Sequence, residues 1–395
     1  MGAMLTLEEA QNRVLALAPP MPIENIACEK AVGRYLAMDL IARRTQPPAD
    51  LSAMDGYAIG GDGTGPWNLV GESRAGTPFD RSLADGETIR ISTGAHMPAG
   101  ADRVLIQENV AVEGSAVSCF QDFPNALRHV RQRGFDFDEG DVILSRGVQI
   151  GPAQLALAIG AGHREIPVHR APTIAIIDSG DELAKDPATC RDDQIPASNG
   201  AMIAAMLAEL GCETVRLGPV QDDRDALASA LGQAEACDIV VTTGGASVGD
   251  HDLMRPALEA WGADLDFWKV AMKPGKPIMV ASRDKQVIFG LPGNPVSSFV
   301  TCYLFVLPLV RAALGDAAPL PQSVLLEAGC NLPPVGSRRE FLRSYWDGTT
   351  VKLVDSQDSS ALAALAQANC LIDRPAHSDQ IEAGTSVPCL LLKNG

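Results

Sequence analysis

The feature that most restricts the fold of this chain is an alternation of strand-like and helix-like stretches between Pro172 and Leu314. Apolar runs of strand length, beginning with TIAIID (173–178), alternate with helical stretches such as SNGAMIAAMLAELG (198–211). This alternation predicts a doubly wound, mostly parallel sheet with crossover helices on both faces. Ligands of such sheets bind beyond the carboxyl ends of the strands, so the loops after TIAIID, DIVVTT and QVIFGL are the first candidates for a site.

The segments on both sides of this region follow other patterns. We expect a helix over 5–18, where Thr6 and Glu9 form a capping box, and a second helix over 152–162, and we expect the two to pack together. Recurring glycines and short β-prone pieces between them indicate an inserted β domain, and short strands return in the tail. The predicted division is 1–45 with 141–171, an inserted β domain over 46–140, an α/β domain over 172–316, and a C-terminal β domain over 317–395.

Composition restricts the partners. The formal net charge of -17 argues against nucleic acid and anionic membranes, so an anionic substrate would need a local basic cluster. The longest apolar run, 299–310, is too short to span a bilayer. Nine scattered cysteines without a CxxC pair are typical of the reducing cytoplasm, where we expect the protein to act.

The stretch TTGGASVGDHD (242–252) follows the strand DIVVTT and combines glycines with acids. It has the glycine spacing of a P-loop, but Asp250 and His251 stand where a P-loop has Lys and Ser or Thr. It is either a structural turn in which Asp252 caps the next helix, or a loop whose backbone N–H groups face a phosphate while a carboxylate holds a divalent metal.

Further acids follow the neighbouring strands. Asp181 and Glu182 come after TIAIID, and Asp222 and Asp223 come after the next strand, ETVRL. Each alone is a helix cap or a solvated acid, but together they would lie at one edge of a parallel sheet. Carboxylates from several loops beside a glycine turn predict a magnesium–phosphate site.

Positive charge concentrates in KVAMKPGKP, where Lys269 lies in a strand and Lys273 and Lys276 flank a Pro-Gly turn. In an acidic chain this is either a solvated turn or an anion site. The segment GLPGNPVSS follows, in which Asn294 can cap a helix that begins at Pro295 and exposes N–H donors.

These stretches together resemble the molybdopterin molybdenumtransferase family, the MoeA proteins and the gephyrin E domain. The matching segments occur in the family's order: SAMDGYA, RISTGAHMPAGAD, RQRGFD, SGDEL, Ser198-Asn199, TTGGASVGDHD, FWKVAMKPGKP, GLPGNPVSS, EFLR and SSALAALAQAN. The resemblance implies an elongated homodimer whose subunits have four domains, the last of them β barrel-like. It implies a magnesium-dependent insertion of molybdate into adenylylated molybdopterin, with release of AMP.

The resemblance also implies roles for individual residues. Glu182, Asp222 and Asp252 would hold magnesium. The choice between Asp222 and the adjacent Asp223 stays open. Ser179 replaces the family's usual Thr, and Phe135 replaces an acid. The implied catalytic residues are Asp55, Thr93, Asp136, Glu182, Asp222, Lys269 and Lys273, the first three from the partner subunit. The implied substrate- and molybdate-binding residues are Gly244, Gly245, Ser247, Lys276, Pro292, Pro295, Ser297, Arg343 and Ser359.

Other functions compete with this one. A molybdopterin adenylyltransferase or nucleotide pyrophosphatase would share the α/β domain but would need neither SAMDGYA nor EFLR. A gephyrin-like scaffold would carry further fused domains. A divergent or tungstate-specific paralogue stays open. As partners we expect a second copy of the chain and transient contacts with the adenylyltransferase and with cofactor-accepting enzymes.

Overall fold

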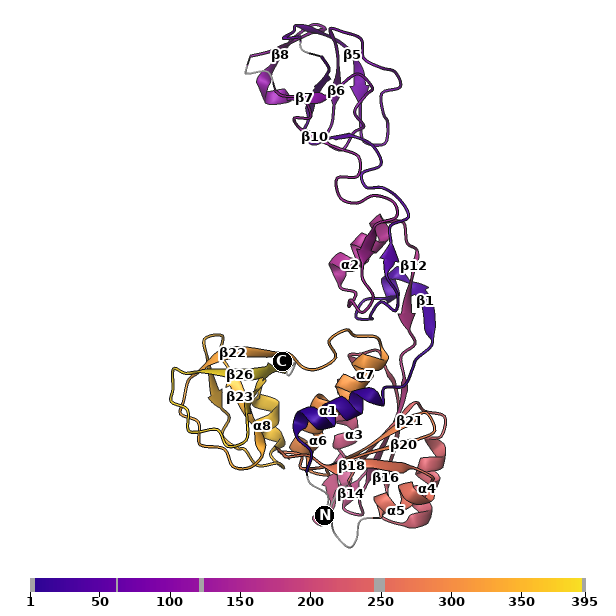
Figure 1. Ribbon diagram of the computed structural model, residues 1–395, viewed down its shortest axis with the longest axis vertical. Helices are drawn as coiled ribbons and strands as arrows, with labels where there is room; N and C mark the ends of the chain where they lie inside the picture. The colour runs from indigo at the N-terminus through magenta and orange to yellow at the C-terminus, as the bar shows by residue number, and fades with distance from the viewer. Residues whose placement is uncertain (1–3, 62, 121–123, 245–252, 393–395) are drawn as a thin grey trace.

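The computed structural model describes residues 4–61, 63–120, 124–244 and 253–392. The chain forms an elongated molecule with the inserted β sheet at one end and the α/β sheet and C-terminal barrel at the other (Figure 1). Two extended connections, which carry small two-stranded sheets and a helix, join the ends.

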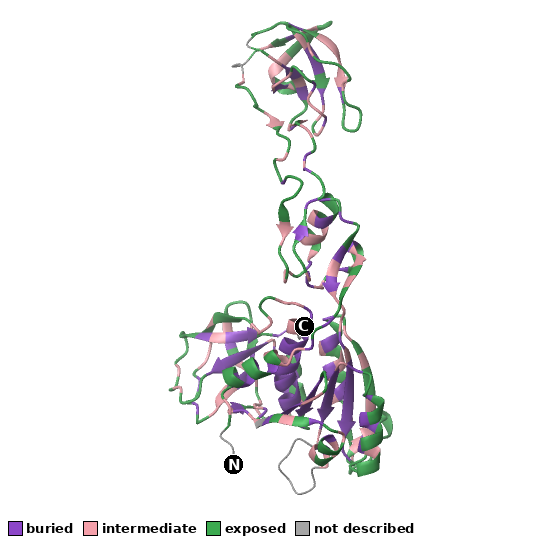
Figure 2. Ribbon diagram, turned by 45° about the vertical axis from the view of Figure 1, so that its right-hand side comes forward, coloured by how far each residue is buried: buried purple, intermediate pink, exposed green. Residues whose placement is uncertain are grey.

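The central sheet has the order β16-β13-β17-β21-β20-β18, and its strands are mostly buried (Figure 2). The first four strands are parallel, as expected, but β20 runs antiparallel to both of its neighbours, β21 and β18, so the sheet is mixed. Only Asp284 and Lys285 separate β20 from β21, which leaves room for a hairpin turn and none for a crossover helix. The strands are β13 (Thr173–Ser179), β16 (Glu213–Val220), β17 (Ile239–Thr243), β18 (Asp264–Lys269), β20 (Pro277–Arg283) and β21 (Gln286–Leu291).

Helices cover both faces of this sheet and give two apolar cores. Helices α1 (Leu7–Ala16) and α3 (Asn199–Ala208) pack on one face, and α4 (Arg224–Gln233) and α5 (Met254–Ala260) pack on the other. The capping box of Thr6 and Glu9 is confirmed. The expectation that α1 packs with the helix near residue 152 is wrong, because the apolar stripe of α1 lies in the α/β core.

A long buried helical segment, Pro295–Ala313, forms the centre of this core. It consists of α6 (Pro295–Thr301), a π-helical turn, η4 (Cys302–Val306), and α7 (Leu307–Ala313). By length and composition it could cross a membrane, in contrast to the shorter apolar run in the sequence, but most of it is buried inside the protein. It is therefore a core helix here.

The inserted part is an all-β unit, as its sequence indicates. Its six-stranded sheet has the order β7-β4-β6-β5-β9-β8 and encloses a small apolar cluster. The strands are β4 (Gly56–Ile59), β5 (Trp67–Ser73), β6 (Glu87–Ile91), β7 (Arg103–Ile106), β8 (Val110–Glu113) and β9 (Ala116–Cys119), with η2 (Gln107–Asn109) and the pair β3 (Leu51–Ser52) and β10 (Val130–Arg131) beside it.

The connecting part carries helix α2 (Pro152–Gly160), which packs in its own apolar cluster. Around it lie β1 (Ile23–Ala27) with β12 (Glu165–His169), β2 (Leu40–Ile41) with β11 (Val142–Leu144), and η1 (Cys28–Lys30).

The C-terminal part is a closed five-stranded barrel, because β23 pairs with both β24 and β25. Its strands are β22 (Ser323–Ala328), β23 (Arg339–Trp346), β24 (Thr350–Leu353), β25 (Cys370–Arg374) and β26 (Ser386–Leu391), and its helix is α8 (Leu362–Gln367). The short strand β19 (Met272–Lys273) joins β23 of the barrel. The lysine segment therefore links the α/β sheet to the barrel. The residue limits of the four-domain division stay a prediction.

Candidate functional site

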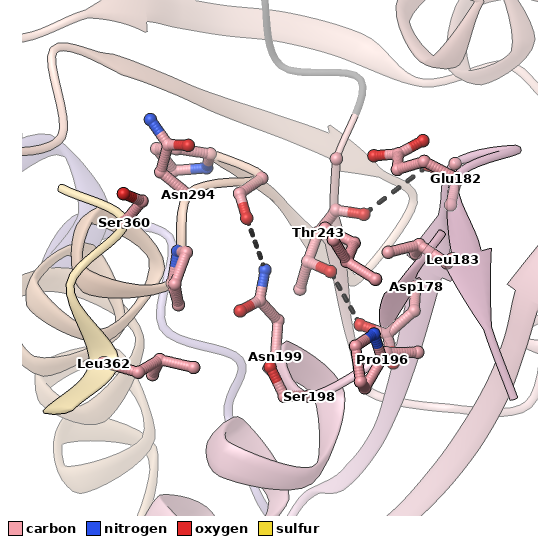
Figure 3. Close-up of a pocket in the computed structure, with 18 of the residues that line it drawn as sticks. Asp178, Glu182, Leu183, Pro196, Ser198, Asn199, Thr243, Asn294, Ser360 and Leu362 are labelled. Atoms are coloured by element: carbon pink, nitrogen blue, oxygen red, sulfur yellow. Dashed lines mark hydrogen bonds between the residues drawn. The ribbon is translucent and has the colours of Figure 1, made fainter. Parts of the chain in front are cut away.

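A cavity of about 740 Å³ opens at the carboxyl ends of β13 and β17, where the sequence places the candidate site. The loops that follow β13, β16 and β21 form most of its wall, and Ser360 and Leu362 close it from the C-terminal part. Figure 3 shows side chains from these separate elements around one space. Among the predicted residues, its lining includes Glu182, Asp222, Gly244, Pro292 and Pro295.

Asp178, at the end of β13, is a buried carboxylate in the cavity wall. Its Oδ1 accepts a hydrogen bond of 2.6 Å from the Thr243 hydroxyl on the neighbouring strand, and Arg216 lies 3.8 Å from its Oδ2. A side chain at Gly200 would collide with this carboxylate, since an ideal Cβ there would lie 2.2 Å from Oδ2. Parallel pairing and a glycine together fix this acid at the base of the cavity.

Three carboxylates crowd the adjoining wall. Burial and the charges of Asp181 and Glu182 raise the pKa of Asp222. Gly180, with φ of 152°, lets the Glu182 carboxylate fold back, because a Cβ there would lie 2.5 Å from Oε2. Asp223 is occupied elsewhere, since its Oδ1 accepts from two N–H groups at the start of α4. The structure thus places Asp222, not Asp223, at the cavity.

This crowding is the observation that fits a divalent cation. Like charges in a partly desolvated wall repel one another, and a cation between them removes that cost. Glu182 and Asp222 would hold the ion. Within the described residues, no group of three or more His, Cys, Asp or Glu side chains is arranged to hold a metal. The third predicted ligand, Asp252, lies outside the described residues, as do Gly245 and Ser247.

Gly244, the last described residue of the glycine loop, lies against the loop after β13. Its φ is 88°, and a Cβ would approach the backbone oxygen of Ser179 to 2.2 Å. Only glycine permits this approach of two chain segments. Gly244 therefore lets the chain after β17 pack directly against Ser179 in the cavity wall.

Two asparagines tie the cavity wall together. The Asn199 amide donates to the Gly293 carbonyl at 2.7 Å. Asn294 occupies the cap position of α6 but makes no side-chain cap, in contrast to the expectation; its amide donates to the Ser359 hydroxyl at 3.0 Å. The Val296 N–H also donates to the Ser359 carbonyl. Ser359 therefore docks the C-terminal part on the loop at the start of α6.

None of the three predicted lysines lines the cavity, although the segment that carries them leads into its wall at Pro277. Lys269 ends β18, and Lys273 and Lys276 are exposed on either side of the Pro274-Gly275 turn. This turn packs on α6, because a Cβ at Gly275 would come within 2.5 Å of the Thr301 side chain. Pro277, directly after it, lines the cavity. Ser297 is buried within α6, and its carbonyl accepts from Thr301.

Arg343, an expected substrate- and molybdate-binding residue, makes hydrogen bonds to its own chain in this structure. It is 1% exposed, and its guanidinium donates to the carbonyls of Ser356 and Asp358. Burial lowers its pKa, although Asp358 opposes this. In this conformation Arg343 holds the loop that carries Ser359 and Ser360.

The three remaining predicted residues lie outside the cavity. Asp55 precedes β4 and accepts from both the N–H and the hydroxyl of Thr93, which follows β6. These hydrogen bonds lower the pKa of Asp55. Asp136 follows β10. All three belong to the chain around the inserted sheet, which lies at the end of the molecule opposite the α/β sheet (Figure 1).

Sequence reasoning missed three polar groups of the cavity as site residues: Asp178, Thr243 and the side chain of Asn199. Each lies where a strand ends or a helix begins, which is a usable signal in a doubly wound fold. The strap β14 (Leu183–Ala184) with β15 (Ile195–Pro196), which places Leu183, Ile195 and Pro196 in the cavity wall, and η3 (Pro187–Thr189) were also not expected.

Known proteins share this arrangement along the whole chain. Family models match as the MoeA N-terminal region (domain I and II) over 5–162, a probable molybdopterin binding domain over 175–312, and the MoeA C-terminal region (domain IV) over 326–392. A Haemophilus influenzae protein called molybdopterin molybdenumtransferase is 32% identical, with 97% of this chain and 98% of that protein covered. One of the same name from Staphylococcus aureus is 32% identical over 99% of this chain and 96% of its own length.

Solved structures agree. Two structures of the molybdopterin biosynthesis MoeA protein from Pyrococcus horikoshii superpose with TM-scores of 0.84 and 0.86, at 27% and 26% identity. The matches cover 99% and 98% of this chain and 100% of both solved chains.

The fold and the matches define a multidomain enzyme with a molybdopterin-binding type of α/β domain. The chain belongs to the molybdopterin molybdenumtransferase family, and is thus a transferase of molybdenum cofactor biosynthesis. The resemblance seen in the sequence is confirmed.

Proposed function

We propose that this protein inserts molybdate into adenylylated molybdopterin in a magnesium-dependent reaction that releases AMP. The observation that carries the proposal is the meeting, in one cavity, of the crowded carboxylates Glu182 and Asp222 with the loop Pro292–Pro295, beside a lysine-bearing segment. A polyanionic substrate bound together with a metal ion suits this mixture of charges. The carboxylates would repel the substrate alone, and the lysines would repel the metal ion alone.

The chain's own residues would then divide the work. Bound magnesium would neutralise the phosphate at the bond to be cleaved. Glu182 and Asp222 would hold it, and Lys269, Lys273 and Lys276 would attract the molybdate dianion. Asn294 and Ser359 would keep the C-terminal part closed on the cavity.

A homodimer belongs to this proposal, because the chain around the inserted sheet, which carries Asp55, Thr93 and Asp136, lies at the end of the molecule opposite the α/β sheet (Figure 1). The connecting part exposes six large apolar side chains that a second copy would cover. They are Ile23, Val32, Met38, Ile41, Val142 and Ile159, which are 42–55% exposed. We propose the cytoplasm as the place of action, with transient contacts to the adenylyltransferase and to cofactor-accepting enzymes.

The test is molybdate-dependent AMP release from adenylylated molybdopterin in the presence of magnesium. We expect release by the native protein, at least a hundredfold loss in Asp222→Asn and Lys273→Ala (about 3 kcal/mol of transition-state stabilisation), and near-native release in Lys285→Ala. Lys285 is an exposed lysine in the β20–β21 turn and serves as the charge-matched control. A folded protein without release would contradict the proposal, and release only with tungstate would assign the other oxyanion.

A further inference from the structure

Three charged residues stand in register across three neighbouring strands at the junction of the α/β part and the barrel. Lys273 of β19 pairs with Glu340 of β23, and Glu340 pairs with Arg374 of β25. The row therefore reads positive, negative, positive. Cross-strand neighbours of opposite charge attract one another, so Glu340 lies between two cations.

The two cations differ in exposure and in bonding. The Lys273 side chain is 54% exposed, and its ammonium donates to Glu340 Oε1 at 3.1 Å. Arg374 is 1% exposed, and one of its terminal nitrogens donates to the Asp379 carbonyl. Within the described residues, Arg374 Nε and Nη1 have no hydrogen-bond partner.

A buried guanidinium with two nitrogens that lack a hydrogen-bond partner is costly, and its presence needs a compensating role. The pKa of Arg374 is lowered by burial, and the charge of Glu340 opposes that shift. The side chain of Glu340 is itself only 16% exposed. If Lys273 moved away, Glu340 would become a poorly solvated anion unless Arg374 compensated its charge.

We propose that Arg374 is a positioning residue of the oxyanion site: it takes over the charge of Glu340 when Lys273 leaves Glu340 for a bound dianion. The inference rests on the proposed function, in which Lys273 attracts molybdate. In the free protein Glu340 holds the lysine. On binding, the ammonium turns to the oxyanion, and the two free nitrogens of Arg374 receive the carboxylate. Glu340 thus competes with the oxyanion for Lys273, and Arg374 weakens that competition.

The test is a double-mutant cycle on molybdate affinity, measured by calorimetry with sodium molybdate and the full chain. We expect Arg374→Met to bind molybdate about tenfold more weakly, because Glu340 then keeps Lys273. Glu340→Gln should bind at least as tightly as the native protein. The double variant should match Glu340→Gln within about twofold, because Arg374 has nothing left to compensate. Lys352→Met, which removes an exposed cation from β24 of the same barrel, is the control and should bind as the native protein does.

Several outcomes would overturn the inference. If Arg374→Met weakens molybdate binding equally in the native protein and in Glu340→Gln, the arginine has only a structural role. Tenfold weaker binding by a folded Glu340→Gln would do the same, and this variant decides the matter if Arg374→Met does not fold. Failure of the native protein to bind molybdate would instead overturn the proposed function. Thermal unfolding then still tests the interaction between Glu340 and Arg374, since Arg374→Met should lower the melting temperature less when Glu340 is already Gln.

Discussion

At the scale of single residues, the cavity is built from groups that stabilise the fold poorly. Asp222 is the clearest case, because burial and two neighbouring acids disfavour its charged form. A carboxyl whose pKa is raised in the folded state reduces stability at neutral pH, and this cost disappears as the pH falls below the raised pKa. Such a group is retained for binding.

We therefore expect Asp222→Asn to increase the free energy of unfolding at pH 7, by less than about 1 kcal/mol because solvent screens the site. The gain should shrink as the pH falls toward 4, where the native carboxyl takes up a proton. Magnesium should raise the melting temperature of the native protein more than that of the variant. Fluorimetric melting with and without magnesium checks both. Asp192→Asn, on an exposed loop, is the control. A lower melting temperature in Asp222→Asn would contradict the crowding argument.

The sequence predicted the acids at the strand ends but not their division of labour. Asp222 and Asp223 are indistinguishable by composition, and only the start of α4 separates the cap from the cavity residue. Asp178 ends an apolar strand, and its role depends on the register that sets it beside Thr243. Cross-strand register and close approaches at glycine are three-dimensional facts that a pattern along one chain does not contain.

At the scale of elements, helix α1 repairs a defect in the core helix. Pro308 has no N–H, so the Leu304 carbonyl lacks its usual partner within the helix. The buried side chain of Gln11 donates to this carbonyl at 3.1 Å. The π-helical turn 302–306 ends two residues before the proline. A polar residue on the apolar face of α1 is thereby explained.

We expect Gln11→Ala to lower the free energy of unfolding by about 1–3 kcal/mol, because it leaves a buried carbonyl without a donor. Asn12→Ala, on the exposed face of the same helix, should change it by less than about 0.5 kcal/mol. Urea unfolding of the three proteins measures the difference. Equal effects of the two substitutions would show that helix propensity, and not the carbonyl, is responsible.

Elements whose partners are local were predictable, and elements whose partners are distant were not. The capping box of α1 and the strands of the parallel half follow from short patterns. The packing of α1 on the core helix and the joining of β19 to the barrel connect segments far apart in the chain. Periodicity gives the apolar face of an element but does not name what covers it.

At the scale of the whole molecule, the separation of the two ends has a direct consequence for catalysis. The residues near the inserted sheet and the cavity of the same subunit lie at opposite ends (Figure 1). If a partner supplies Asp55 and Asp136, each working site is made by two chains. In a mixed dimer of one subunit altered near the inserted sheet and one altered in the cavity, both defects then fall in the same site, and the other site is intact.

We expect Asp55→Ala and Lys273→Ala to be inactive alone and to regain activity when subunits are mixed and reassociated. Random reassociation gives mixed dimers in half of the population, each with one intact site, so about a quarter of native AMP release should return. Mixing two variants of the same end, Lys273→Ala and Asp222→Asn, is the control and should restore nothing. Recovery in the control, or none in the first mixture, would argue against a site shared between subunits.

The hydrogen bond from Gln11 to Leu304 spans 293 positions of the chain. A ribosome makes the donor early and the acceptor only after the inserted β unit and the connecting part have emerged. The first helix must therefore wait while later segments fold, since contacts between distant positions form late. We expect the inserted unit to be structured on nascent chains before the α/β core closes, so that the last core helix to leave the ribosome sets the time at which the N-terminus is finally held.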